Sequence, residues 1–357
     1  MRVMFLLASL IVFILRAEIA MAVEFDSAGE LGAPASLAQK PSAKKDQAAY
    51  STPFGLLNFR ADFEDEVSAE LEVSYGIAKD AATGKAIPQV EKLFMQIPIG
   101  EIGYSVLLGQ IGNPWVEMQE RESPDWYYLG SFFRTPALHW NSLSRADNGM
   151  AVVHESKFSR IFLSMVNGEG AGMDETGPRK ETQLQIEGFP IETFRGEESI
   201  FVAIGLMEGG YEDVESEIAQ RERILAYVKY DVLNKGSIGL EGLWTKDPVD
   251  KINKKVADEV DLTDLGGFVV KGMGAALNLE AWLTEKTKLS LRGETLNPAL
   301  GVDARGLSSL MLGFHFFPRQ SLQFSLAWLD VQYEKNHNVT VRDSSAVVFG
   351  ARLRWPE

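Results

Sequence analysis

The most regular pattern in the chain is a pair of stretches, joined by a short turn, in which hydrophobic and polar residues alternate. Both lie within residues 306–331. A period of two over each stretch predicts two β-strands, and the turn at residues 317–320 predicts a hairpin. Each arm is about ten residues long, the length of a strand that crosses a membrane. The hydrophobic face is formed by Leu310, Leu312, Phe314, Phe316, Leu322, Phe324, Leu326 and Trp328.

The same alternation recurs along residues 53–357, and short connections alternate with long ones rich in polar and charged residues. A transmembrane barrel has tight turns at one rim and long loops at the other. A soluble sandwich also alternates with period two, but nothing in its architecture keeps long loops on every second connection. The pattern therefore favours an all-β fold, a transmembrane antiparallel up-and-down β-barrel.

Fifteen strands can be counted in this pattern, whereas bacterial barrels have even numbers of strands. We therefore predict sixteen strands, with fourteen as the alternative. The ascending strand that is missing from the count could be weakly encoded within residues 23–52. It could also lie in a segment such as 129–134.

The first 22 residues have the features of a secretory signal peptide. Met1-Arg2 precedes an apolar run over residues 3–15, and Ala20-Met21-Ala22 resembles a cleavage site. Residues 23–52, rich in Ala, Ser, Gly, Lys and Pro without periodicity, are expected to be a flexible N-terminal segment before the barrel. No segment outside the leader has 18 consecutive apolar residues, so if the chain crosses a membrane, it must cross it with β-strands.

If the apolar set faces lipid, the alternating set faces the lumen of the barrel. That set carries charges of both signs, which need a wet interior because burying an unpaired charge is costly. A wide, water-filled barrel is thus favoured over a closed one. The candidate pore-lining residues are Arg60, Asp62, Glu70, Glu72, Glu187, Lys229, Glu241, Glu280, Lys288, Arg292, Glu294, Arg352 and Arg354.

One long segment, residues 111–145, breaks the strand pattern and is rich in aromatic and charged residues. A loop of this length and composition is expected to pack against other parts of the protein and not to project alone into water. It could fold into the lumen and narrow the pore, or it could pack outside on neighbouring loops or another subunit. For the first alternative, the constriction candidates are Trp115, Glu117, Arg121, Trp126 and Arg134.

The chain resembles the phosphate-selective-porin-like (OprO/OprP-type) and related bacterial outer-membrane porin families over about residues 55–355. The resemblance is clearest in LGQ at 108–110, NPW at 113–115 and MVNGEG at 165–170. It implies a sixteen-stranded barrel that is often a homotrimer and passes small ions or solutes by diffusion. The family's ladder of lumenal arginines and lysines has no counterpart here, so phosphate selectivity is not implied.

Enzymatic chemistry finds little support. Cysteine is absent, the four histidines (139, 154, 315 and 337) lack metal-ligand spacing, and no G-x-S-x-G motif occurs. His315, within the hairpin, is expected to be lumenal or packed. The net charge of −15 argues against nucleic acid as a partner.

The sequence therefore predicts an outer-membrane porin, surrounded by lipid, that conducts small ions or solutes without a cofactor and is not an enzyme. Two alternatives remain open. One is a secreted or periplasmic all-β binding protein, such as a carbohydrate binder. The other is an outer-membrane barrel enzyme of the lipase kind.

Overall fold

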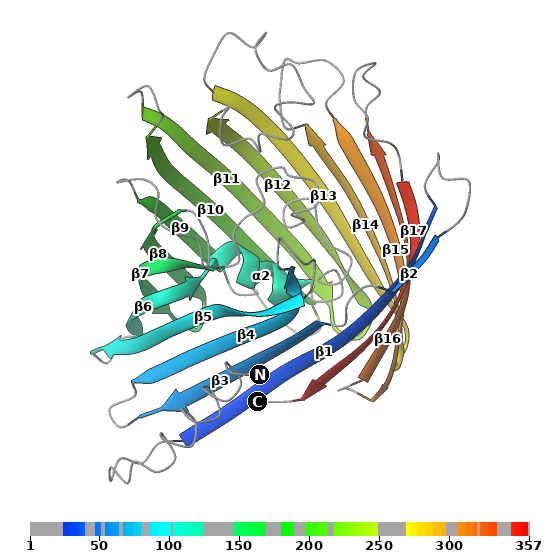
Figure 1. The fold of residues 1–357 in the computed structure, drawn as a ribbon, viewed down its shortest axis with the longest axis horizontal. Coiled ribbons are helices and arrows are strands. Elements are labelled where there is room, and N and C mark those ends of the chain that lie inside the picture. Colours follow the sequence, from blue (N-terminus) through cyan, green and yellow to red (C-terminus); the bar gives the residue numbers. More distant parts are fainter. Residues whose placement is uncertain are drawn as a thin grey trace.

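The computed structural model describes residues 24–39, 47–50, 54–63, 67–79, 86–100, 103–123, 146–168, 180–188, 198–212, 218–248, 269–297, 306–319, 322–333 and 344–355. These residues form seventeen strands and one helix, α2 (Figure 1). Within them, no helix is long and apolar enough to cross a membrane. The elements are β1(Glu24–Gln39), β2(Gln47–Tyr50), β3(Phe54–Asp62), β4(Ser68–Lys79), β5(Ala86–Ile99), β6(Tyr104–Gly112), α2(Pro114–Glu122), β7(Ala146–Glu155), β8(Ser159–Val166), β9(Glu181–Gly188), β10(Glu198–Glu212), β11(Ile218–Val232), β12(Gly236–Pro248), β13(Val269–Thr284), β14(Thr287–Asn297), β15(Leu307–Arg319), β16(Leu322–Tyr333) and β17(Ser344–Trp355).

The strands form one closed antiparallel sheet. From β3 to β17 each strand pairs with the next along the chain, and β1 closes the ring by pairing with β17 on one side and with β2 and β3 on the other. Because β2 and β3 follow one another along the same edge of β1, the seventeen strands occupy sixteen positions around the barrel. The prediction of an up-and-down β-barrel is confirmed, and its strand positions match the larger of the two predicted numbers.

The strand that the sequence pattern did not reveal is β1. It lies within residues 23–52, where a flexible segment was expected, and that expectation is wrong for residues 24–39. Eleven residues of β1, from Gly29 to Gln39, are in register with β17. The physical reason is closure, because without β1 the outer edges of β3 and β17 would leave their backbone groups unpaired. The other possible location, residues 129–134, lies outside the described residues, as does the predicted signal peptide.

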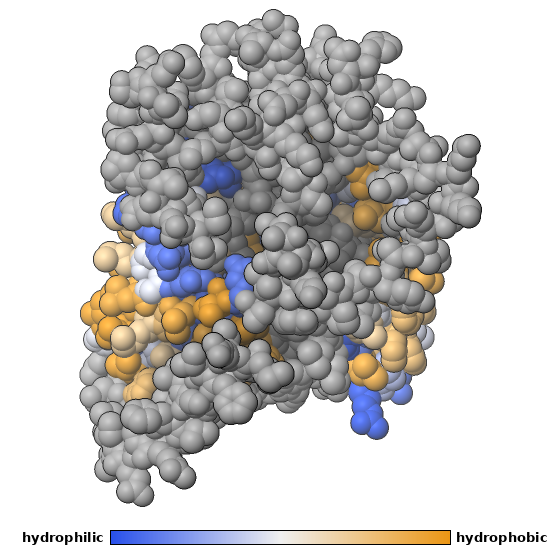
Figure 2. Space-filling model, in the orientation of Figure 1, coloured by the Kyte–Doolittle hydropathy of each residue, from blue (hydrophilic) through white to orange (hydrophobic). Residues whose placement is uncertain are grey.

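The strands expose their hydrophobic residues outward and bury the alternating set inward. In β15, Leu312 and Phe314 are 47% and 41% exposed, whereas Met311 and His315, which flank them in the sequence, are 1% and 0% exposed. This is the reverse of a soluble protein, in which the apolar face would be the buried one. Figure 2 shows hydrophobic residues gathered across the middle of the described surface. The outward face is therefore suited to a lipid environment.

Short and long connections alternate around most of the ring, as the sequence predicted. The exception is that nine residues (189–197) connect β9 to β10, whereas only five (213–217) connect β10 to β11. The tight turns include residues 233–235 between β11 and β12, where Asn234 adopts a left-handed backbone conformation with φ 60°. Asparagine tolerates this conformation better than most residues with a side chain. The connection between β4 and β5 covers only residues 80–85, because β5 begins at Ala86.

Candidate functional site

Helix α2 follows β6 directly and is encoded by local capping signals. The side chain of Asn113 accepts hydrogen bonds from the backbone N–H groups of Trp115 (3.0 Å) and Val116 (3.4 Å), and Pro114 occupies the first helical turn. Glu117 in the first turn and Arg121 in the last turn complement the helix dipole. A nine-residue helix is marginal on its own. Its surroundings must therefore supply most of its stability.

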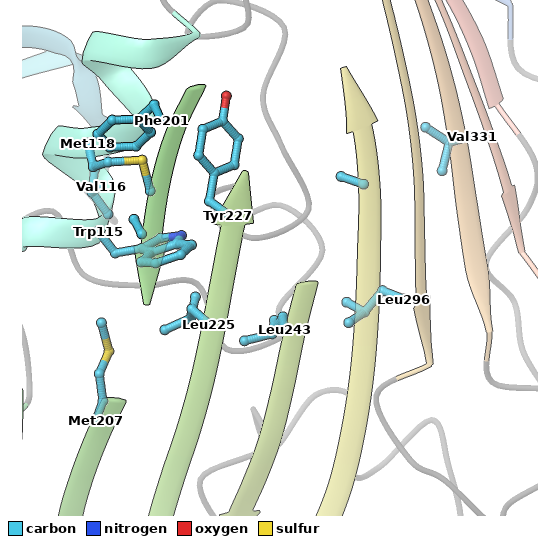
Figure 3. Close-up of a cluster of buried hydrophobic side chains, with 12 residues drawn as sticks. Trp115, Val116, Met118, Phe201, Met207, Leu225, Tyr227, Leu243, Leu296 and Val331 are labelled. Atoms are coloured by element: carbon cyan, nitrogen blue, oxygen red, sulfur yellow. The ribbon is translucent and has the colours of Figure 1, made fainter. Parts of the chain in front are cut away.

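Those surroundings are the inner wall of the barrel, because α2 lies inside the ring of strands (Figure 1). Trp115 and Met118 are fully buried and belong to one hydrophobic cluster with Phe201 of β10 and Leu225 of β11 (Figure 3). The indole of Trp115 fits against Gly205 of β10, where an added Cβ would lie only 2.9 Å from the ring. The helix is thus docked on one side of the lumen, against β10 to β13.

A buried carboxylate from the barrel wall fixes the start of the helix. Glu241 of β12 accepts hydrogen bonds from the Trp115 indole N–H (3.0 Å) and from the side-chain amide of Gln119. The guanidinium of Arg292 in β14 pairs with the other oxygen of the same carboxylate at 3.1 Å. Arg292 also pairs with Glu294 and donates to Asn278. Glu241 therefore joins the helix to an ion-pair network on the inner wall.

Three further ion pairs connect α2 to strands on different sides of the lumen. Glu117 pairs with Lys92 of β5 at 2.7 Å, and Arg121 pairs with Glu187 of β9 at 2.5 Å. At the C-terminal end, Lys229 of β11 pairs with the Glu122 carboxylate at 3.4 Å and also donates to the backbone carbonyl of Glu122 at 2.9 Å. These contacts span the barrel from β5 to β11. The helix consequently crosses part of the lumen and narrows it.

The charge of Arg121 is stable in this position. Burial acts to lower its pKa, but the Glu187 carboxylate and hydrogen bonds to Glu122 and Glu187 outweigh burial and raise the pKa above its ordinary value. Its guanidinium also lies 5.6 Å from the ring centre of Phe201. The helix thus holds a permanent cation, Arg121, inside the barrel beside its three carboxylates, Glu117, Glu120 and Glu122.

On the side away from the hydrophobic cluster, α2 borders an open cavity of about 760 Å³. Most residues that line it are charged or polar, and they come from β3 to β8, β17 and the helix itself. The cationic lining residues are Arg60, Lys92, Arg121, Arg160 and Arg352. The carboxylate lining residues are Glu70, Glu117, Glu120 and Glu155. A polar cavity of this size beside a helix that narrows the barrel is the candidate permeation path.

The structure divides the predicted pore-lining residues into two groups. Arg60, Glu70 and Arg352 line this cavity, and Asp62 pairs with Arg60 at 2.9 Å. The second group is engaged in inner-wall ion pairs rather than lining this cavity, and its members are Glu72, Glu187, Lys229, Glu241, Glu280, Lys288, Arg292 and Glu294. The side chain of Arg354 lies outside the described residues.

The predicted constriction residues are also divided. Trp115, Glu117 and Arg121 lie in α2, inside the lumen, so the first part of the irregular segment takes the inward of its two expected positions. Trp126 and Arg134 lie outside the described residues. The sequence did not single out Lys92 and Arg160, although both alternate with apolar residues of their strands in the same way as the predicted set.

Within the described residues, no group of three or more potential ligands could hold a metal ion. His315 is fully buried on the inner wall, where its Nε2 lies 2.6 Å from the Ser290 hydroxyl and its Nδ1 lies 2.9 Å from the Ser325 hydroxyl. This serine–histidine pair has no access for a substrate. Its Nδ1 lies against the Ser325 hydroxyl and the Gln323 amide (3.0 Å), whereas the Nδ1 of a triad histidine binds the triad carboxylate.

No protein-family model matches the chain, and no curated protein has significant similarity to it. Solved structures do match over nearly the whole chain. An anion-selective porin from Comamonas acidovorans is 11% identical with a TM-score of 0.68, and the alignment covers 93% of this chain and all of the porin. OmpF of Salmonella typhi, in a complex with daunomycin, is 9% identical with a TM-score of 0.64. That alignment covers 93% of this chain and 97% of OmpF.

OmpT of Vibrio cholerae, an outer-membrane protein described in a trimer form, is 14% identical with a TM-score of 0.58. That alignment covers 94% of this chain and all of OmpT. At such low identities these likenesses concern the fold alone. The chain has the fold of outer-membrane β-barrel porins.

Proposed function

We propose that this chain is a porin of the bacterial outer membrane that lets small ions and solutes diffuse through a water-filled lumen. The observation that carries the proposal is the position of α2 beside a charged cavity of about 760 Å³ within a closed barrel. An apolar outer face supports insertion into lipid, and charges on the inner wall support a wet interior. No cofactor is needed for diffusion.

The two alternatives fit these features less well. A soluble binding protein would leave the outward apolar residues of many strands in contact with water, far more than the usual exposed patch of a soluble monomer. A lipase-like barrel enzyme needs an accessible nucleophile. The Ser290–His315 pair is buried and therefore does not meet this need.

Two experiments test the porin proposal. The protein should be found in the outer-membrane fraction and should migrate differently in detergent gels before and after heating, as folded barrels do. In liposomes, the refolded protein should let small sugars enter and cause swelling, with rates that fall as the sugar becomes larger. A freely soluble periplasmic protein, or a folded barrel that admits no solute, would contradict the proposal.

We also propose that the native assembly is a homotrimer. The support is the fold shared with OmpT, one structure of which is described as a trimer form. Sedimentation of the protein in detergent measures the assembled mass directly. A mass of one chain under mild extraction conditions would count against the trimer without affecting the channel itself.

The arginines of the cavity wall are expected to set the ion preference of the pore. Arg160 and Arg352 both line the passage, so replacing them by glutamine removes two positive charges from the path of a permeating ion. We expect the double variant R160Q/R352Q to have a higher ratio of cation permeability to anion permeability than the original protein. The reversal potential in a salt gradient measures this change, and it should shift toward the cation equilibrium potential.

The matched control is K235Q, which removes a positive charge from the exposed turn between β11 and β12. This variant should leave the reversal potential close to that of the original protein. An equal shift in both variants would show that overall charge, and not the cavity wall, determines the preference.

A further inference from the structure

One part of the inner wall departs from the polar character of the lumen. Phe94 of β5, Leu107 of β6, Val153 of β7 and Phe162 of β8 all point inward and line the same cavity. We refer to these four residues as the apolar strip. Val153 is directly paired with Phe162 in the sheet, and Leu107 is paired with Gln96, two residues along β5 from Phe94. The strip therefore runs continuously over four neighbouring strands.

The rest of the cavity lining is largely charged. Glu117, Glu120 and Arg121 of α2 line the same cavity, as does Arg60 of β3. A wall that served only hydrated inorganic ions would gain nothing from aromatic rings, because apolar surface in contact with water is unfavourable. A solute with one flat apolar side and one charged end would satisfy both kinds of wall at once.

The charge at the end of the strip indicates the sign of that solute. Arg160 precedes Phe162 by two residues on the same inward face, with its guanidinium carbon 5.9 Å from the centre of the Phe162 ring. Its side chain makes no ion pair within the described part of the chain. The carboxylate of Glu187, on the neighbouring strand and in register with Arg160, is instead bound by Arg121 at 2.5 Å.

Glu155 is also paired in register with Arg160 and lines the cavity, but its side chain is exposed at the short-turn end of β7. The carboxylate of an organic solute in the cavity would pair with the Arg160 guanidinium, while the apolar part of the solute lies on the strip. Helix α2 presents charges of both signs to the cavity, whereas the charged group beside the Phe162 ring is the positive guanidinium of Arg160. This arrangement favours an organic anion over an organic cation.

We propose that the apolar strip and Arg160 form a subsite for small aromatic carboxylates on their way through the pore. The aromatic ring of the solute lies on Phe94, which is only partly buried, and its carboxylate pairs with Arg160, while Phe162, at 2% exposed, supports Arg160 from within the wall. This inference rests on the proposed porin function and adds a solute class to it. Binding is weak and reversible, because a pore must release what it binds.

The test compares benzoate with acetate in planar bilayers that contain the purified protein. Conductance in potassium chloride is measured first, and then reversal potentials are recorded with benzoate or acetate on one side. In the original protein benzoate should permeate at least as well as the smaller acetate. In F94S/F162S the ratio of benzoate to acetate permeability should fall by roughly two- to ten-fold, the effect of losing one aromatic contact.

Two further variants separate the parts of the subsite. R160Q should lower the permeability of benzoate more than that of benzylammonium, which carries the same ring and the opposite charge. F317S should leave the benzoate-to-acetate ratio unchanged, because Phe317 points inward elsewhere, packed against Trp282 at 5.4 Å. If F94S/F162S does not fold, as judged by its migration in detergent gels, the single variant F94T serves instead, because Phe94 is only partly buried.

The outcomes distinguish this inference from the proposal on which it rests. Absence of any conductance in potassium chloride from folded protein would contradict the porin function itself. Conductance with a benzoate-to-acetate ratio that F94S/F162S or F94T leaves unchanged would overturn the subsite alone. In that case the strip serves only to pack the inner wall together with Ile111 and Val166.

Discussion

Replacement of Glu241 by alanine is expected to lower the free energy of unfolding by about 3–5 kcal/mol, the typical cost of removing one partner from a buried ion pair. The carboxylate is 4% exposed and accepts bonds from Trp115, Gln119 and Arg292. Its loss leaves the guanidinium of Arg292 without one of its counter-charges and removes the anchor of α2. Urea unfolding of the barrel in lipid vesicles measures the difference.

The matched control for E241A is E155A, which removes a carboxylate from the exposed end of β7. A substitution of this kind at the surface normally changes stability by less than about 0.5 kcal/mol. Similar losses in the two variants would show that the Glu241 network does not hold the helix. An intermediate variant, E241Q, keeps an acceptor for Trp115 but not the charge, and should lie between the other two.

Replacement of Trp115 by alanine is expected to release α2 from the wall and to widen the pore. The indole is fully buried between the helix and β10, and truncation of a buried tryptophan typically costs about 3–5 kcal/mol. Because the helix narrows the lumen, its release should raise the single-channel conductance and increase the current noise. Recordings from single channels in planar bilayers measure both quantities.

The control for W115A is W328A, since Trp328 is 39% exposed on the outward face of β16. This variant removes the same side chain from the outer surface and should leave the conductance unchanged. Unchanged conductance in W115A, with the barrel still folded, would mean that α2 does not restrict the permeation path.

The barrel could be predicted from the sequence because its two faces meet different solvents. Lipid outside and water or polar contacts inside impose a period of two, as in Leu310 to Phe316, where every second side chain is exposed and apolar. Strand β1 escaped the prediction because its sequence, rich in Ala, Gly and Ser, carries little alternation. It is a strand because β3 and β17 require a partner between them.

The constriction could be predicted only in part. The capping residues Asn113 and Pro114 are local signals for a helix start and could have placed α2. Its docking partner could not be found in this way, because Glu241 lies 126 residues from Trp115 along the chain and only the closed barrel brings them together. The same holds for Lys92 and Glu117, whose contact depends on how α2 turns back into the lumen.

The apolar strip was missed for a related reason. Phe94 and Phe162 stand at inward positions of β5 and β8, but apolar residues at these positions make the strands nearly continuous in hydrophobicity and weaken the alternation. Only the register of four strands shows that these residues share one surface.

The central claim is that the barrel contains an open, water-filled path beside α2. Single-channel recording of the purified, folded protein in a planar bilayer tests this claim most directly. We expect stepwise insertion events, each adding a constant conductance that rises in proportion to the potassium chloride concentration and persists at low voltage. Folded protein that inserts into the bilayer without carrying current would contradict the account.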